Sequence, residues 1–144
     1  MRFWDSSAIV PLVVDEPASV AALAEYRRDP EQAVWWATEV ECVSALARLE
    51  REGSLDAAGV RDALERLAWL ASAWLEVQPV ERARRIAARL LRVHPLRAAD
   101  AFQLSAALIL AEDEPASVEV VTLDDRLAQA AEREGCRVMR PAGA

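Results

Sequence analysis

Arg2-Phe3-Trp4-Asp5-Ser6-Ser7-Ala8 is a short apolar run that ends at an acid and two hydroxyls. A second apolar run, Ile9-Val10-Pro11-Leu12-Val13-Val14, follows directly. This pattern predicts a buried strand that turns into a helix, with Asp5 at the junction. A carboxylate in that place can cap the helix by accepting hydrogen bonds from its first free amides, or it can belong to a functional site.

Length and composition predict one globular domain over residues 1–144, with 53% apolar and 28% charged residues. No apolar run approaches the roughly 20 residues that span a bilayer. The N-terminus also lacks the pattern of a secretory signal. We therefore expect a cytoplasmic protein with no membrane association, in which Cys42 and Cys136 are reduced core residues.

The formal net charge of −7 is unevenly distributed. Residues 81–100 hold six arginines against two acids, so this segment is basic while the rest of the chain is strongly acidic. A basic face attracts phosphate groups, whereas acids gathered at one site attract divalent cations. The alternative is that the arginines only form the solvated face of a helix. They are Arg82, Arg84, Arg85, Arg89, Arg92 and Arg97.

All 17 basic residues are arginine, so lysine is absent from the chain. A Walker P-loop needs a lysine on the phosphates, and phospho-aspartate enzymes typically use one as well. The four glycines form no G-x-G-x-x-G pattern, so the dinucleotide-binding fingerprint is missing too. These absences disfavour three common classes of α/β protein.

Strand-like segments alternate with amphipathic helical segments along the chain. We expect strands at residues 2–4, 33–36, 74–77, 117–122 and 136–139, and helices after Asp5 and at 17–28, 38–52, 57–73, 80–93, 96–111 and 125–134. This alternation predicts an α/β fold with a parallel five-stranded sheet flanked by helices on both faces.

In this architecture, functional groups gather beyond the carboxyl ends of the strands. Asp5 and Asp124 directly follow predicted strands, and Glu41 opens the helix after another. Topology therefore places three acids along one edge of the sheet. It does not place Asp100, which follows a break between two helices.

Each of these acids also has a purely structural interpretation. The segment Thr38-Glu39-Val40-Glu41 fits a capping box, in which the glutamate side chain bonds back to the amide of the threonine. Asp124 can cap the helix that follows it, or Thr122 can do so with Asp125 as its partner. Asp100 lies in a first helical turn, where the macrodipole favours an anion.

Taken together, the acids favour a cation site over separate caps. Carboxylates on one edge repel one another and raise each other's pKa unless a cation neutralises them. Oxygen ligands suit Mg²⁺ or Mn²⁺, and the chain lacks the Cys/His set that zinc prefers. The single histidine, His94, precedes a proline in a break, so we expect it at the surface or in a turn rather than acting as a base.

Four short motifs occur in order along the chain: Phe3-Trp4-Asp5-Ser6-Ser7-Ala8, Thr38-Glu39-Val40-Glu41-Cys42-Val43-Ser44-Ala45-Leu46, Leu96-Arg97-Ala98-Ala99-Asp100-Ala101-Phe102-Gln103-Leu104 and Val121-Thr122-Leu123-Asp124-Asp125-Arg126-Leu127. In order and spacing, over essentially the full length, the chain resembles the PIN-domain nucleases. It is most similar to the VapC-type toxins of prokaryotic toxin–antitoxin pairs.

The resemblance implies an acidic quartet and two supporting hydroxyls. Ser7 matches a hydroxyl that supports the first acid, and Thr122 matches one that supports the last. By position, the quartet is Asp5, Glu41, Asp100 and Asp124.

Two positions in the quartet have a competing residue. Glu39 competes with Glu41, which we prefer because it directly precedes the apolar helix face of the family. Asp125 can substitute for Asp124 as the fourth acid.

The implied activity is that of a Mg²⁺- or Mn²⁺-dependent endoribonuclease. Asp5 and Asp100 would hold the principal metal with Glu41 nearby, and Asp124 would orient a second ion or a water. A water activated by the metal would attack in line, leaving a 5′-phosphate and a 3′-hydroxyl.

The implied partners are RNA, a small cognate antitoxin that covers the acidic cleft, and a second copy of the chain in a homodimer. Arg85, Arg89 and Arg97 are the candidates for holding the RNA backbone. Core packing explains most of the five tryptophans, and Trp69 and Trp74 are the candidates for an interface.

Two other functions compete with this one. A catalytically silent PIN-like module would act only by binding or dimerisation, although all four acids are retained. A phosphatase with Asp5 as nucleophile would need a second acid in place of Ser7, and a lysine that the chain does not possess.

Overall fold

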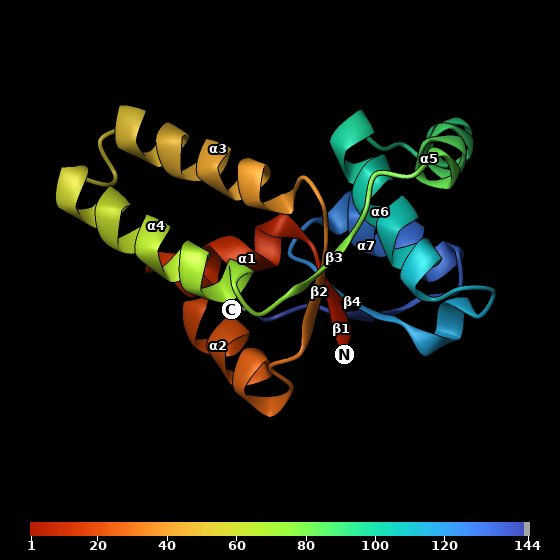
Figure 1. The fold of residues 1–144 in the computed structure, drawn as a ribbon, viewed down its shortest axis with the longest axis horizontal. Coiled ribbons are helices and arrows are strands. Elements are labelled where there is room, and N and C mark those ends of the chain that lie inside the picture. The colour runs from red at the N-terminus through yellow and green to blue at the C-terminus, as the bar shows by residue number, and fades with distance from the viewer. Residues whose placement is uncertain (143–144) are drawn as a thin grey trace.

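The computed structural model describes residues 1–142 as a five-stranded parallel sheet with helices on both faces (Figure 1). The strands are β1 (Arg2–Trp4), β2 (Gln32–Trp35), β3 (Leu75–Val77), β4 (Glu119–Val121) and β5 (Arg137–Met139). They lie in the order β3-β2-β1-β4-β5, so β1 is central. The predicted fold class is confirmed.

Side chains that alternate along the central strands divide the core into two clusters. Phe3 and Val120 point into one cluster, and Trp4 and Val121 point into the other. Because successive residues of a strand face opposite sides of the sheet, each strand contributes to both clusters. This explains why the buried stretches at residues 3–4, 33–35 and 120–121 are continuously apolar instead of alternating with polar residues.

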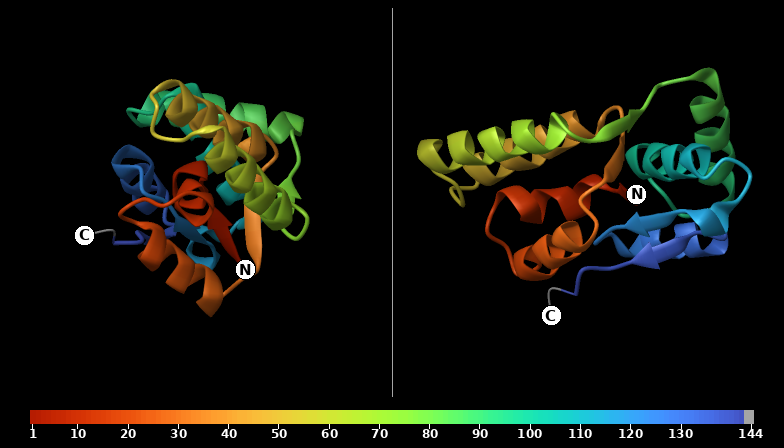
Figure 2. Two further views of the ribbon diagram at one scale, coloured as in Figure 1. Left: turned by 90° about the vertical axis from the view of Figure 1, so that its left-hand side faces the viewer. Right: turned by 60° about the horizontal axis from the view of Figure 1, so that its bottom comes forward.

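Two groups of helices cover the two faces. The first face packs against α5 (Glu81–Val93), α6 (Ala98–Leu110) and α7 (Asp125–Arg133). The second packs against α1 (Ser6–Val13), α3 (Thr38–Arg51) and α4 (Ala57–Ala71), while α2 (Ser19–Arg28) lies on α1. Helices α3 and α4 run side by side and extend away from the sheet (Figures 1 and 2).

Several element boundaries differ from the predicted ones. The strand expected at 117–122 is shorter, because residues Pro115–Ser117 form a 3₁₀ turn whose proline starts it. The helix expected from residue 17 begins at Ser19, whose hydroxyl accepts a hydrogen bond from the Glu16 amide at 2.8 Å. The helix expected from residue 96 begins at Ala98, after an extended Arg97.

Expected at the surface or in a turn, His94 lies in a bend, but it is buried and not at the surface. It follows α5 in a break, as expected, but its Nε2 lies 2.7 Å from Oε2 of Glu134 at the end of α7. Burial of an imidazole is tolerable here because the carboxylate provides a polar partner.

The two cysteines are buried and unpaired, as expected. Burial raises the pKa of Cys42 to about 12 and that of Cys136 to about 11, so both thiols stay protonated at neutral pH. Over residues 1–142, no helix has the length and apolar character needed to cross a membrane.

Trp4, Trp35 and Trp74 are buried, whereas Trp36 and Trp69 are exposed. Of the two tryptophans expected at an interface, only Trp69 is open to solvent, at 64% exposure. The Trp74 indole instead donates a hydrogen bond to Glu76 Oε2 at 3.1 Å, which gives it a structural role.

Helix α4 offers a matched test of the second cluster. Leu67 is 2% exposed and Leu64 is 39% exposed on the same helix. We expect Leu67→Ala to lower the free energy of unfolding by about 3 kcal/mol, because it removes buried methyl groups and leaves a cavity. Leu64→Ala should cost less than about 1 kcal/mol. Urea denaturation of both variants measures the difference, and equal losses would contradict the assigned core.

Candidate active site

The candidate site lies where the chain changes direction across the sheet. From central β1 the chain first builds β2 and β3 on one side, and later returns to place β4 on the other side. In such sheets a crevice opens beyond the carboxyl ends of the two strands that flank the reversal. Here these strands are β1, followed by Asp5, and β4, followed by Thr122. The Asp5 amide joins them by donating to the Val121 carbonyl at 3.0 Å.

Asp5 is almost fully buried, with 3% of its surface exposed. The hydroxyls of Ser7 and Thr122 donate to its Oδ2 at 2.5 and 2.9 Å. Although Asp5 stands at the N-cap position of α1, its side chain caps no backbone amide. The capping interpretation is therefore wrong for Asp5, and both expected supporting hydroxyls contact it.

Glu41 lies in the first turn of α3, but it does not form the capping box. The residue at the N-cap position is Ala37, and the helix start has no side-chain cap. Instead, Oε1 of Glu41 accepts hydrogen bonds from Ser6 Oγ at 3.0 Å and from Gln103 Nε2 at 2.8 Å. The competing Glu39 is exposed and does not line the pocket described below.

Asp100 is half-buried in the first turn of α6, as its position in the sequence suggests. Asp124 caps α7, since its Oδ1 accepts from the Leu127 amide at 2.8 Å. Asp125 is exposed and pairs with Arg140. The structural role expected for Asp124 is therefore present, although Asp124 also borders the pocket.

These acids perturb one another electrostatically. Burial, only partly offset by the two hydroxyls, raises the pKa of Asp5, and the charges of Glu41 and Asp124 add to the effect. Burial and Asp100 raise the pKa of Glu41, while Gln103 and Ser6 oppose the shift. Burial, Asp124 and Asp5 raise the pKa of Asp100, while Arg97 opposes the shift. The acids therefore share one region, including the Asp100 that topology left unplaced.

The acids border an open pocket of about 620 Å³. Asp5 itself is not among the lining residues, but its Oδ1 lies 3.5 Å from the hydroxyl of Ser6, which does line the pocket. The lining combines carboxylates with two hydroxyls and arginines, and consists of Ser6, Glu41, Ser44, Arg97, Ala99, Asp100, Asp124, Asp125 and Arg126.

The donor set of this region fits a hard divalent cation. Within residues 1–142, no three acid, histidine or cysteine side chains form a compact ligand group. Mg²⁺ does not require one, because it keeps several waters and is usually held by one or two carboxylates. Asp5 and Asp100 together could supply these carboxylates. The charge of Asp5 raises the pKa of Asp100, and a bound cation relieves this kind of repulsion between carboxylates.

The three arginines proposed for RNA differ in their surroundings. Arg97 lines the pocket, and Arg85 is exposed on α5. Arg89 instead donates to Glu134 at 2.8 Å, beside His94. This hydrogen bond, with the adjacent charge, raises the pKa of Arg89 and lowers that of Glu134.

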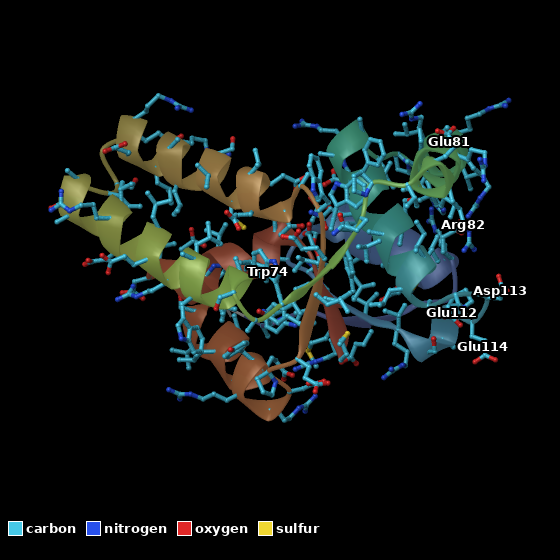
Figure 3. The ribbon with its side chains drawn as sticks, viewed as in Figure 1. Trp74, Glu81, Arg82, Glu112, Asp113 and Glu114 are labelled. Carbon is cyan, nitrogen blue, oxygen red and sulfur yellow. The ribbon has the colours of Figure 1, made fainter. Side chains whose placement is uncertain are left out.

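Other arginines of the basic segment also have acidic neighbours. Arg82 lies 3.8 Å from Asp113, which belongs to the acidic loop after α6 that also holds Glu112 and Glu114 (Figure 3). Arg84 lies 3.5 Å from Glu81 on the same helix. For part of this segment, the alternative that the arginines only form the solvated face of a helix therefore holds.

Sequence reasoning missed Ser44 and Arg126 of the pocket lining, and it missed the two residues that hydrogen-bond Glu41. Ser6 and Gln103 both donate to Glu41. The available signal was weak: Gln103 is a polar residue one helical turn after Asp100, on a segment that is otherwise largely apolar.

Comparison with protein-family models matches the PIN domain over residues 2–133. Among solved structures, FitAcB from Neisseria gonorrhoeae is similar, with a TM-score of 0.68 and 20% identity, covering 98% of each chain. FitAB bound to the IR36 DNA fragment gives a TM-score of 0.67 at 19% identity, covering 98% of this chain and 95% of that one. PAE2754 from Pyrobaculum aerophilum gives 0.61 at 22% identity, covering 95% and 82%. A search of curated proteins found no match.

The extent of the family match shows that the chain belongs to the PIN-domain family, a family of nucleases. At their level of identity, the solved structures show a shared fold. The family resemblance recognised from the four motifs is confirmed.

The raised pKa of Asp100 predicts a dependence of stability on pH. The folded protein binds this proton more tightly than the unfolded chain does, so ionisation of Asp100 destabilises the metal-free fold once the pH rises above the ordinary pKa. We expect Asp100→Asn to raise the thermal midpoint at neutral pH, and the gain to disappear in acid. Calorimetry in EDTA measures it, with Asp62→Asn at an exposed position of α4 as the control. An equal gain at both pH values would contradict the assignment.

Proposed function

We propose that this chain is a Mg²⁺- or Mn²⁺-dependent endoribonuclease toxin of the VapC type. The observation that carries the proposal is the convergence of Asp5, Glu41 and Asp100 at one crevice of a PIN-domain fold, with the pKa of each carboxyl raised partly by the others. Ionised carboxylates that repel one another when no cation is bound are the arrangement expected of a metal-dependent site.

In this proposal, Asp5 and Asp100 would hold the cation with Glu41 nearby, and Asp124 would orient a second ion or a water. When bound, the cation lowers the pKa of a coordinated water and offsets charge that develops on the scissile phosphate. Ser7 and Thr122 keep Asp5 oriented by occupying its Oδ2. Products with a 5′-phosphate and a 3′-hydroxyl are expected, without a histidine base or a covalent nucleophile.

Arginines at the rim of the site would hold the RNA backbone. Arg97 has the strongest support because it lines the acidic pocket, and Arg85 is exposed on the neighbouring helix. Arg89 has less support because Glu134 already accepts its hydrogen bonds. Guanidinium groups suit this role because they contact phosphate oxygens in a bidentate manner.

The proposed partners follow from the family resemblance. A small cognate antitoxin would cover the acidic pocket, and two copies of the chain would form a homodimer. Trp69 is available to an interface because its indole is exposed. The cytoplasm is the proposed compartment, since RNA is the proposed substrate and both cysteines are free.

The competing functions have less support. A silent binding module has no need for acids that raise the pKa of neighbouring acids, whereas a metal-dependent nuclease needs such acids at one site. A phosphatase with Asp5 as nucleophile would need a free carboxylate oxygen aided by a second acid, and position 7 holds a serine that donates to Asp5.

Cleavage of RNA tests the proposal directly. Purified protein, freed of any antitoxin, is incubated with structured RNA in Mg²⁺, in Mn²⁺ and in EDTA. We expect cleavage only with the cations. Asp5→Asn and Asp100→Asn should each lower the rate by at least about 100-fold, because each removes a charged metal ligand.

Asp62→Asn, a change of the same chemical kind at an exposed position of α4, should keep the wild-type rate. Circular dichroism confirms that each variant is folded. Cleavage that persists in EDTA, or that survives Asp100→Asn, would refute the metal-dependent nuclease.

RNA binding without cleavage tests the arginines. In an Asp5→Asn background, Arg97→Gln and Arg85→Gln should each weaken RNA binding and reduce the salt slope by about 1, since each removes one phosphate contact. Arg61→Gln on α4 should change neither quantity. Fluorescence anisotropy over a salt series measures both, and an unchanged slope for Arg97→Gln would exclude it from the RNA contact.

A further inference from the structure

Gln103 is a polar side chain buried deep in α6, with 1% of its surface exposed. Its amide nitrogen donates to Thr38 Oγ1 at 3.1 Å and to Glu41 Oε1 at 2.8 Å, both on α3. A buried amide is costly to keep unless it is hydrogen-bonded. The contacts of Gln103 are directed at the acid of the site, although 62 residues separate the two in sequence.

The orientation of this amide is informative. Oε1 of Gln103 is buried and has no hydrogen-bond partner within residues 1–142. If the amide were turned over, its oxygen would face the carboxylate of Glu41, and two acceptors would repel each other. The amide thus leaves its own oxygen unpaired in order to donate to Glu41. A hydrogen bond to an ionised group is roughly twice as strong as one between neutral groups, which explains this preference.

The two donors to Glu41 also share one oxygen. Ser6 and Gln103 both bind Oε1, and within residues 1–142 no side chain or amide is hydrogen-bonded to Oε2. Because Glu41 lines the acidic pocket, this arrangement fixes the carboxylate from one side and leaves its second oxygen free.

We propose that Gln103 is a positioning residue that clamps Glu41 so that its free carboxylate oxygen is presented to a divalent cation, or to a water of that cation. The proposal rests on the proposed nuclease function for the identity of the ligand. Partners that orient the groups around a metal typically change its affinity by about 10- to 100-fold when they are removed.

The test replaces the amide by a side chain of similar shape. Gln103→Met keeps an unbranched side chain but cannot donate to Glu41. Titration calorimetry should show Mn²⁺ binding weakened by about tenfold. RNA cleavage should need about tenfold more Mn²⁺ for half its maximal rate, yet approach the wild-type maximum at saturation, because Glu41 itself is retained.

Ser105→Ala is the matched control on the same helix. Ser105 is equally buried, and its hydroxyl donates to the Ala83 carbonyl at 2.7 Å, away from the pocket. This variant should lose stability without any change in the Mn²⁺ midpoint. If Gln103→Met does not fold, Gln103→Asn carries the same test, because the shorter side chain withdraws the amide from Glu41.

Crystal structures of the metal-free proteins separate this inference from the proposed function. We expect the Glu41 carboxylate to leave its wild-type position in the Gln103 variant, whether or not the protein cleaves RNA. The inference is overturned if Glu41 keeps its wild-type position in the Gln103 variant. It is also overturned if the wild-type protein binds Mn²⁺ and the Gln103 variant shows the same Mn²⁺ midpoint. Wild-type protein that neither binds Mn²⁺ nor cleaves RNA overturns the proposed function instead.

Discussion

Burial of one carboxylate at the end of the central strand is the constraint on which the site depends. Burial of Asp5 disfavours its ionisation, and the charges of Glu41 and Asp124 make ionisation still more costly. Two hydroxyls offset part of this cost by donating to the same oxygen, Oδ2. The protein thus maintains a buried acid at a crevice where it lowers stability, which is typical of functional sites.

The hydroxyls that hold Asp5 also join the two strands that flank the crevice. Ser7, after β1, accepts from the Leu123 amide at 2.9 Å, and Thr122, after β4, accepts from the Asp124 amide at 3.0 Å. The two strand ends therefore form one hydrogen-bonded unit. Asp124 is held in this unit and caps α7 as well, so its structural and electrostatic roles coexist and are not alternatives.

Packing also determines which charges remain available near the site. Arg89 and Arg97 look alike in sequence, but Arg89 meets Glu134 and His94 between the ends of α5 and α7, whereas Arg97 precedes α6 and borders the acidic pocket. A guanidinium already paired with a carboxylate is less available to phosphate. The basic segment is thus divided into structural and accessible arginines by the helices that carry them.

The order of strands and helices, the parallel sheet and the position of Asp5 follow from the sequence by itself, because apolar periodicity and helix signals are local properties of the chain. The family resemblance of residues 96–104 named Asp100 as a site residue, but the predicted topology did not place it. Tertiary structure brought Asp100 to the other acids, buried His94, and replaced the capping box of Glu41 by contacts with Ser6 and Gln103. Each of these outcomes joins residues from separate elements, between 24 and 95 positions apart in the printed sequence. Such contacts depend on how the helices pack on the sheet, so no local pattern of residues encodes them.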